Sequence, residues 1–166
     1  FQKRAIDTLE IILDVLNKKN SQIKKAWQLN ERHYGALTGL NKDEMIKKHG
    51  KNQVHIWRRS FDISPPPMEK THPHNPSSNK TYKTVPPNNI PRSESLKNTF
   101  ERVIPYYEKN IAPLLLSKKN ILISAHGNSL RALCKKLLNI SNEKIIGFEI
   151  PTGNPLLIIF GENLEI

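Results

Sequence analysis

Two short polar runs hold the side chains of this sequence that are best suited to chemistry. The first run, residues 30–35, reads Asn-Glu-Arg-His-Tyr-Gly and places four side chains that carry charge or form hydrogen bonds next to one another. The second run, residues 126–129, reads His-Gly-Asn-Ser and separates an apolar run from a helical pattern. An exposed loop would explain the first run, and an ordinary strand-to-helix turn would explain the second.

The chemistry becomes specific if both runs meet the pair Arg58-Arg59 at one edge of the fold. Guanidinium groups are planar forks that match phosphate or carboxylate oxygens. A carboxylate among them could donate and accept a proton, and an imidazole could act as base, nucleophile or phosphate contact. The set predicts a site for phosphate esters or phosphoryl transfer that needs no metal. The sequence has no P-loop, no Gly-x-Gly-x-x-Gly and no Gly-x-Ser-x-Gly, which disfavours nucleotide-binding and α/β-hydrolase readings.

The element that must position His126 is a strand followed by a helix. Residues 121–125 form a short aliphatic run typical of a strand buried in a parallel sheet. Leu130, Leu133 and Leu137 then recur at helical spacing. This reading places His126 at the carboxyl end of a strand and beside a helix N-terminus, where ligands bind in open α/β sheets and an anion is favoured.

The rest of the chain predicts alternating helices and strands, and hence an α/β fold. Asn41 is a predicted N-cap with Glu44 three residues later, and Pro105 predicts a kink or break inside a long helix. The predicted helices are residues 4–16, 41–48, 53–59 and 96–116. The predicted strands are residues 23–29, with Trp27 as a buried candidate, and residues 156–160, the clearest strand signal, with residues 145–150 a further apolar run.

Residues 64–91 form a Pro-rich stretch without periodicity, which is too long for a simple connector. We interpret it as a lid or binding loop within a single domain that spans residues 1–166; a disordered linker is the alternative. His72 and His74 within it suggest a metal site, but no further Cys, Asp or His lies at ligand spacing. We therefore expect no metal.

The composition limits the classes of function. A net charge of +11 permits an anionic ligand, but the 26 Lys and Arg residues are spread along the chain without interleaved aromatic residues. A nucleic-acid-binding module is therefore the weaker alternative, and no nucleic acid is expected. No apolar run is long enough for a membrane span, so no membrane association is expected. The single cysteine, Cys134, suits a small core residue and a cytoplasmic, reducing location.

The motifs taken together resemble the cofactor-dependent phosphoglycerate mutase family of the histidine phosphatase superfamily. The resemblance extends over the whole chain in the right order, and the bisphosphoglycerate mutases share the same motifs. Its matching motifs are residues 3–5, 29–35, 39–42, 57–60, 65–67, 94–97, 125–131 and 151–153. It implies a three-layer, mostly parallel sheet flanked by helices.

The resemblance also implies a role for each matching residue. His126 matches the second active-site histidine, which contacts the phosphoryl group in transit, and Glu31 matches the carboxylate that exchanges the proton of the substrate hydroxyl. Arg4 matches the arginine that binds the transferring phosphoryl group. Contacts with the substrate or with His126 are implied for Tyr34, Lys42, Arg58, Arg59, Gly127 and Asn128.

The activity implied is interconversion of 3- and 2-phosphoglycerate in glycolysis and gluconeogenesis, primed by 2,3-bisphosphoglycerate, by a homo-oligomer. Bisphosphoglycerate mutase or phosphatase activity is the alternative. The sequence departs from the family in lacking its Arg-His-Gly-Glu motif, which carries the phosphohistidine nucleophile, and its C-terminal tail. We expect the sheet to be incomplete at the N-terminus, and the chain to be a fragment of a full-length mutase rather than a degenerate relative.

Overall fold

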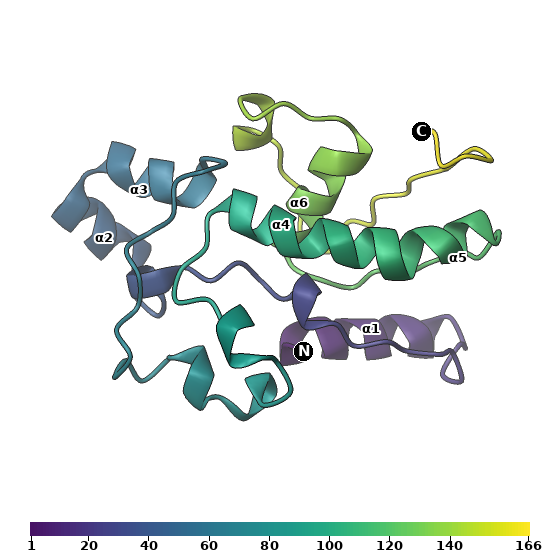
Figure 1. The fold of residues 1–166 in the computed structure, drawn as a ribbon, viewed down its shortest axis with the longest axis horizontal. Coiled ribbons are helices and arrows are strands. Elements are labelled where there is room, and N and C mark those ends of the chain that lie inside the picture. Colours follow the sequence, from purple (N-terminus) through teal and green to yellow (C-terminus); the bar gives the residue numbers. More distant parts are fainter.

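The computed structural model describes residues 1–166, apart from the side chain of Thr81. A long helical rod crosses the middle of the molecule in Figure 1, with one helix below it, one above it and a pair at one end. The rod consists of α4, the π-helical turn η6 and α5. The bounds of the helices are α1 Lys3–Val15, α2 Lys42–His49, α3 Lys51–Arg59, α4 Leu96–Tyr106, η6 Tyr107–Ile111, α5 Ala112–Leu116 and α6 Gly127–Leu137.

The rod confirms the long helix that the sequence predicts, with its irregularity after Pro105. The Ser95 side chain accepts a hydrogen bond from the Asn98 backbone, and the Asn98 side chain accepts one from the Ser95 backbone, so a capping box begins α4. Pro105 has no N–H group to donate to the preceding turn, and the helix passes into the wider η6 turn two residues later.

The main hydrophobic core lies between α4 and α6. Its buried members come from the rod, from α6 and from the 3₁₀ turn η7 (Lys144–Ile146): Leu96, Val103, Ile104, Tyr107, Ile111, Ala132, Leu133 and Ile145. Cys134 is buried as expected, and burial raises the pKa of its thiol to about 11. A smaller cluster of Leu37, Met45 and Val54 packs α2 and α3 together. The two clusters therefore pack α4 against α6 and α2 against α3.

The other predicted helices are also confirmed. α1 and α3 match the predicted spans within two residues, and α6 follows His126 directly. Asn41 is the N-cap of α2, and its side chain accepts a hydrogen bond from the Asp43 backbone at 2.8 Å. Short 3₁₀ turns connect the helices at η1 (Trp27–Leu29), η2 (Gly35–Leu37), η3 (Pro76–Ser78), η4 (Lys80–Tyr82) and η5 (Pro87–Asn89).

The predicted sheet is not confirmed, because the described residues contain no strand. The predicted strand at residues 23–29 ends instead in the 3₁₀ turn η1, where Trp27 is only half-buried, and residues 145–150 begin within the 3₁₀ turn η7. Residues 121–125 and 156–160 belong to no helix or strand. Leu157 and Ile159 are 81% and 76% exposed, so the apolar pattern of the second run has no covering partner in this structure. Strand formation depends on pairing with another segment, which a local pattern does not supply.

Residues 64–91 have no α-helix or strand and contain the 3₁₀ turns η3, η4 and η5. One end of this stretch is fixed against the first polar run, because the Ala36 backbone donates to the Pro66 carbonyl at 2.8 Å. Gly35 lies at the same crossing with a φ of +57°, and a Cβ atom there would lie 2.1 Å from the Pro66 oxygen. Only glycine fits this conformation and this separation.

The described residues contain no candidate metal cluster and no candidate membrane span. No group of three or more His, Cys, Asp or Glu side chains in the described part of the chain could hold a metal ion. His72 and His74 lie with their ring centroids 5.6 Å apart. Among the described residues, no helix is long and apolar enough to span a membrane.

Candidate active site

Glu31, in the first polar run, is joined to the second run at the N-terminus of α6. Its Oε1 atom accepts hydrogen bonds from the Asn128 side chain at 3.0 Å and from the Asn128 backbone at 3.3 Å. Asn128 is the second residue of α6, where backbone N–H groups lack partners within the helix. The helix N-terminus that we predicted as an anion site therefore holds a carboxylate of the protein itself. The Asn128 side chain also donates to the Tyr34 hydroxyl at 2.9 Å, which links three predicted site residues.

His126 contacts Arg4, which lies 122 positions away in the sequence. Arg4 Nη2 lies 3.0 Å from His126 Nδ1. A guanidinium has no acceptor, so Nδ1 must accept this hydrogen bond, and the neutral ring then has its proton on Nε2. Ser129 holds the residue from the other side, because the His126 backbone donates to Ser129 Oγ at 3.2 Å.

The surroundings of His126 favour its neutral form. The side chain is buried, and this burial lowers the pKa of the imidazole below its ordinary value of 6.5. The nearby Arg4 lowers the pKa further, whereas the Glu31 carboxylate acts against both effects. The geometry and the pKa thus agree on a neutral ring whose Nε2–H is a hydrogen-bond donor.

Two cavities meet at Glu31 and Tyr34, which line both. The smaller, of about 310 Å³, also contains His126, Arg4 and Arg32 in its walls. The larger, of about 380 Å³, is lined by both polar runs, by α2 and α3 and by the segment after η7. Its cationic members are Lys42, Lys51, Arg58, Arg59 and Arg131, and His55 lies among them. The lining also contains two carboxylates, those of Glu31 and Glu149. The Lys and Arg side chains outnumber them, so the larger cavity suits an anionic ligand.

Arg32 is a buried cation with unused donors. It is 1% exposed, and only its Nη2 has a partner, the Arg58 carbonyl at 3.2 Å. Its Nε and Nη1 atoms are buried without a hydrogen-bond partner among the described residues. The guanidinium carbons of Arg32 and Arg58 lie 4.6 Å and 5.1 Å from the centre of the Tyr34 ring. A buried guanidinium with free donors beside a cavity is suited to receive oxygens from a ligand.

Arg131 is a site residue to which the sequence reading gave no role. It is buried on α6, and its donors reach Asn128 Oδ1 at 2.9 Å and the Phe148 carbonyl at 2.9 Å. It thereby holds the side-chain amide of Asn128 in the orientation that serves Glu31. Arg131 lies in the motif 125–131, but no local pattern predicts its contacts. One partner is Asn128 on the preceding turn of α6, and the other is the Phe148 carbonyl, 17 positions away.

The structure brings all nine predicted site residues to the two cavities. Arg4 and His126 lie in the smaller cavity, and Glu31 and Tyr34 lie in both. The larger cavity contains the others, Lys42, Arg58, Arg59, Gly127 and Asn128. Arg59 is paired with Glu149, whose position next to the site the sequence did not suggest.

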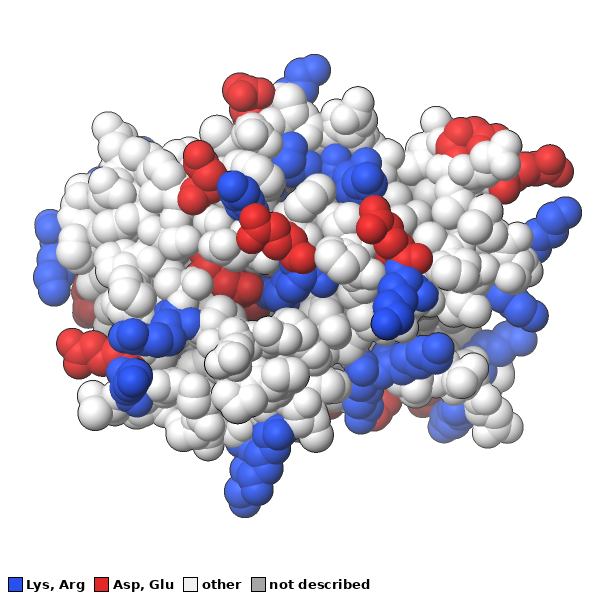
Figure 2. Space-filling model, viewed as in Figure 1, with Lys and Arg blue, Asp and Glu red and all other residues white. Residues whose placement is uncertain are grey.

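The surface charge is mixed on the face shown in Figure 2, where Lys and Arg side chains alternate with Asp and Glu side chains over several elements. No single basic stripe crosses this face. A nucleic-acid backbone needs an extended row of cations. The cationic residues that do converge are those around the larger cavity, whose volume suits a small anion.

Comparison with known proteins gives the family. The model of the histidine phosphatase superfamily (branch 1) matches residues 2–75. A 2,3-bisphosphoglycerate-dependent phosphoglycerate mutase of Pelagibacter ubique (strain HTCC1062) is 56% identical, over 95% of this chain and 66% of its own length. The enzymes of the same name from Hydrogenobaculum sp. (strain Y04AAS1) and Erythrobacter litoralis (strain HTCC2594) are 48% and 52% identical, over 67% and 71% of their lengths.

The chain spans about two thirds of the length of these relatives, and the likeness covers 95% to 100% of the chain itself. The fold of the superfamily is α/β, which agrees with the predicted fold class. The chain belongs to the family of the 2,3-bisphosphoglycerate-dependent phosphoglycerate mutases, within the histidine phosphatase superfamily.

Proposed function

We propose that the full-length protein is a phosphoglycerate mutase that interconverts 3-phosphoglycerate and 2-phosphoglycerate in glycolysis and gluconeogenesis. The observation that carries the proposal is the convergence of the Glu31 carboxylate and the His126 imidazole, at cavities lined by arginine and lysine side chains. The substrate is a three-carbon acid with a carboxylate, a phosphate and a hydroxyl. The cavities offer donors for the two anionic groups and a carboxylate for the hydroxyl proton.

Glu31 is proposed to exchange the proton of the substrate hydroxyl. Both hydrogen bonds from Asn128 go to Oε1. The side-chain amide of Asn128 is itself held by Arg131. A fixed carboxylate that lines both cavities can reach a hydroxyl in either.

His126 is proposed to bind the phosphoryl group in transit rather than to move protons. Its neutral ring, fixed by Arg4 at Nδ1, presents Nε2–H as a donor. Arg4 would bind the same phosphoryl group, since its guanidinium has further donors. The two side chains together would stabilise negative charge on the phosphoryl oxygens.

The cationic lining of the larger cavity is proposed to hold the carboxylate and the distal phosphate of the substrate. Arg58 and Arg59 at the end of α3, Lys42 at the start of α2 and the Tyr34 hydroxyl are the candidate contacts. The exposed Gly127, beside Asn128, would admit an oxygen near the start of α6. Arg32, with two unpartnered buried nitrogens, fits the second phosphate of 2,3-bisphosphoglycerate, the proposed priming cofactor. When bound, that cofactor would supply a phosphoryl group.

Two parts of the proposal concern features that the structure does not show. The Arg-His-Gly-Glu motif, which the family resemblance associates with the phosphohistidine nucleophile, does not occur in these 166 residues. We also propose that residues 121–125 and 156–160 are strands of a mostly parallel sheet with helices on both faces, because both runs are aliphatic and neither lies in a helix.

A mutase assay on the full-length protein tests the function. We expect conversion of 3-phosphoglycerate that depends on added 2,3-bisphosphoglycerate and survives EDTA. Activity that EDTA abolishes and bisphosphoglycerate leaves unchanged would contradict the proposal. The product ratio separates the alternative, because a bisphosphoglycerate mutase or phosphatase would form or hydrolyse 2,3-bisphosphoglycerate faster than it forms 2-phosphoglycerate.

The proposal extends to the state and location of the protein. Ile11, Val15 and Leu16 at the end of α1 are 58% to 75% exposed, and a second copy of the chain would cover them in a homo-oligomer. Light scattering on the full-length protein checks this. The single buried cysteine and the glycolytic substrate support a cytoplasmic location.

A further inference from the structure

The proposed proton-exchange residue lies on a segment with no regular structure. Residues 30–34 are neither helix nor strand, although they lie between the 3₁₀ turns η1 and η2. Peptide groups in such a segment have no ladder or helical partners, and those shielded from water must find partners elsewhere. The position of the Glu31 carboxylate therefore depends on whatever binds the backbone on either side of it.

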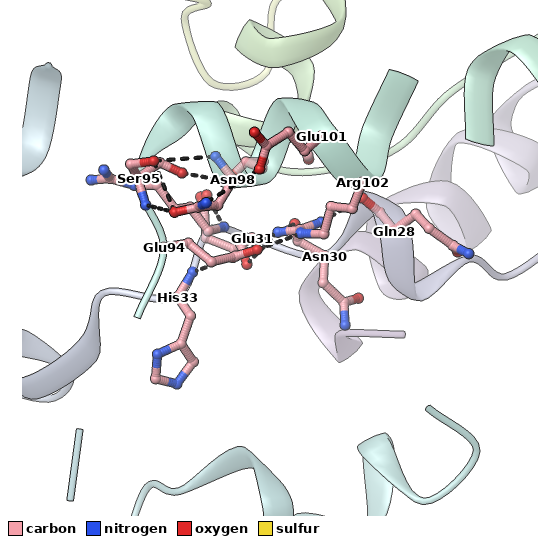
Figure 3. Close-up of polar contacts among 12 residues, drawn as sticks. Gln28, Asn30, Glu31, His33, Glu94, Ser95, Asn98, Glu101 and Arg102 are labelled. Atoms are coloured by element: carbon pink, nitrogen blue, oxygen red, sulfur yellow. Dashed lines mark hydrogen bonds and ion pairs between the residues drawn. The ribbon is translucent and has the colours of Figure 1, made fainter. Parts of the chain in front are cut away.

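Arg102 on α4 binds three backbone carbonyls in and just before this segment, while the Glu31 N–H donates to Gln2 Oε1 at 3.0 Å. Arg102 Nη2 donates to the Asn30 carbonyl at 3.0 Å and to the Glu31 carbonyl at 3.3 Å, and its Nη1 donates to the Gln28 carbonyl. Figure 3 shows the Arg102 guanidinium beside this backbone, reaching down from α4. The Arg102 side chain is 11% exposed, so these hydrogen bonds are largely shielded from competing water.

Glu94 fixes both Arg102 and the far side of the segment. Its side chain is 4% exposed, and it accepts from Arg102 Nε at 2.7 Å and from Arg102 Nη2 at 2.9 Å. Its Oε2 also accepts from the His33 backbone at 2.8 Å, and its own backbone donates to the His33 carbonyl at 2.8 Å. Glu94 and Arg102 thus bind the chain on both sides of Glu31, as Figure 3 shows.

The chemistry of the pair explains why these two residue types stand here. A guanidinium has five N–H donors in a fixed plane, so it binds a carboxylate in two places and still reaches several carbonyls. A lysine ammonium in the same position could satisfy the carboxylate, but it could not span the carbonyls on the other side. The Glu94 carboxylate compensates the buried charge of Arg102, which would otherwise be costly to hold away from water.

We propose that Glu94 and Arg102 are positioning residues, which hold the backbone of residues 28–33 so that the Glu31 carboxylate faces the substrate. The inference rests on the proposed function in one respect, the role of Glu31 in turnover. Neither side chain lines either of the two cavities, so both act through Glu31 and not by touching the substrate.

The test compares Arg102→Lys with Arg92→Lys in the full-length protein. Arg92 is a matched control because its Nε also donates to a backbone carbonyl at 2.8 Å, but to that of Met68 in residues 64–91 and not to one in residues 28–33. We expect Arg102→Lys to lower kcat at least about tenfold and to change KM less than about twofold, with Arg92→Lys close to wild type. In a Glu31→Gln background, the same change should lower the residual kcat less than about twofold. Equal losses in both backgrounds would show a general structural effect and overturn the proposal.

Amide hydrogen exchange provides a readout that needs no activity. In Arg102→Lys the backbone amide of His33, which donates to Glu94 Oε2, should exchange at least about tenfold faster, while the amides of α1 keep their wild-type rates. Unchanged exchange at His33 overturns the proposal. Glu94→Gln keeps the size of the side chain and should give the same pattern to a smaller extent, so it decides the matter if Arg102→Lys does not fold. An inactive wild-type protein with this exchange pattern would refute the proposed function alone.

Discussion

The two cavities at Glu31 are both lined by arginine and histidine side chains, but these side chains differ in how far they are exposed to water. In the smaller cavity His126 and Arg32 are 5% and 1% exposed, and Arg4 is hydrogen-bonded to His126. In the larger cavity Lys42, Lys51 and His55 are exposed, and Arg58 and Arg59 are half-buried. Electrostatic interactions are stronger away from water, and a buried group has fewer positions available.

This difference in exposure suggests that the two cavities have different roles in turnover. In the smaller cavity the buried His126 and Arg32 are desolvated groups of the kind that stabilise a reacting centre. The larger cavity has exposed and half-buried cations of the kind that hold the distant anions of a ligand. If this division of roles holds, changes in the first should alter kcat and changes in the second should alter KM.

The largest effect should come from removing the Glu31 carboxylate, which lines both cavities. Glu31→Gln keeps the shape and the acceptor for the Asn128 amide but cannot exchange a proton. We expect kcat to fall by roughly 10² to 10⁴ and KM to change little. Steady-state kinetics of the full-length protein measure this. A variant with normal kcat and weakened binding would show that Glu31 belongs with the binding groups.

The next largest effect should come from the buried exception in the larger cavity, Arg131. Arg131→Met removes its hydrogen bonds to the Ile145 and Phe148 carbonyls and to Asn128 Oδ1, and leaves the buried Ile145 and Asn128 oxygens without this donor. We expect the free energy of unfolding to fall by about 3 kcal/mol. Urea unfolding measures it, with Lys136→Met as control, since Lys136 is an exposed cation on the same helix. Equal stability of the two variants would mean that Arg131 serves only a ligand.

A smaller effect is expected at the half-exposed cation Arg59. Arg59→Ala should raise KM about tenfold, since it removes one charge-assisted contact with an anion, and should leave kcat within about threefold. Lys48→Ala removes the same charge from an exposed site on α2 that lines neither cavity. Kinetics on both variants test the division directly. A loss confined to kcat in Arg59→Ala would contradict the assignment of the larger cavity.

The smallest effect concerns pH and the enclosure of His126. Burial lowers the pKa of His126 in the folded protein below its ordinary value of 6.5, so the unfolded chain takes up this proton first as the pH falls. Stability should therefore decrease as the pH falls below about 6.5 and level off below the folded pKa. The variant His126→Gln should lose less stability between pH 7 and pH 5 than the wild type does. His33, whose pKa burial also lowers, contributes equally to both proteins. Parallel curves would mean that His126 is not desolvated.

The sequence predicted the local parts of this structure well. The helices, the N-cap at Asn41 and the position of His126 before α6 all follow from periodicity and capping rules, which act over a few residues. The sheet could not be predicted in the same way, because a strand forms only when another segment pairs with it. No two described segments pair as strands.

The supporting residues of the site were beyond a sequence reading. Arg102 binds the carbonyls of residues 28, 30 and 31, which lie 71 to 74 positions away, and no pattern in the sequence relates an arginine to a backbone carbonyl. The residues that would touch a ligand were recognised because they occur in motifs. The roles of Arg102 and Arg131 became visible only from their burial and contacts.

Gly35 has a consequence for mutational tolerance beyond its own position. The Pro66 oxygen would lie 2.1 Å from a Cβ atom at residue 35, so a hydrogen atom is all that separates the two crossing segments. An added methyl group would force residues 34–36 away from residues 65–67 and would move Tyr34, whose ring and hydroxyl border both cavities. A substitution that touches neither cavity would then misalign both. The lack of a side chain at Gly35 therefore limits which substitutions the whole site tolerates.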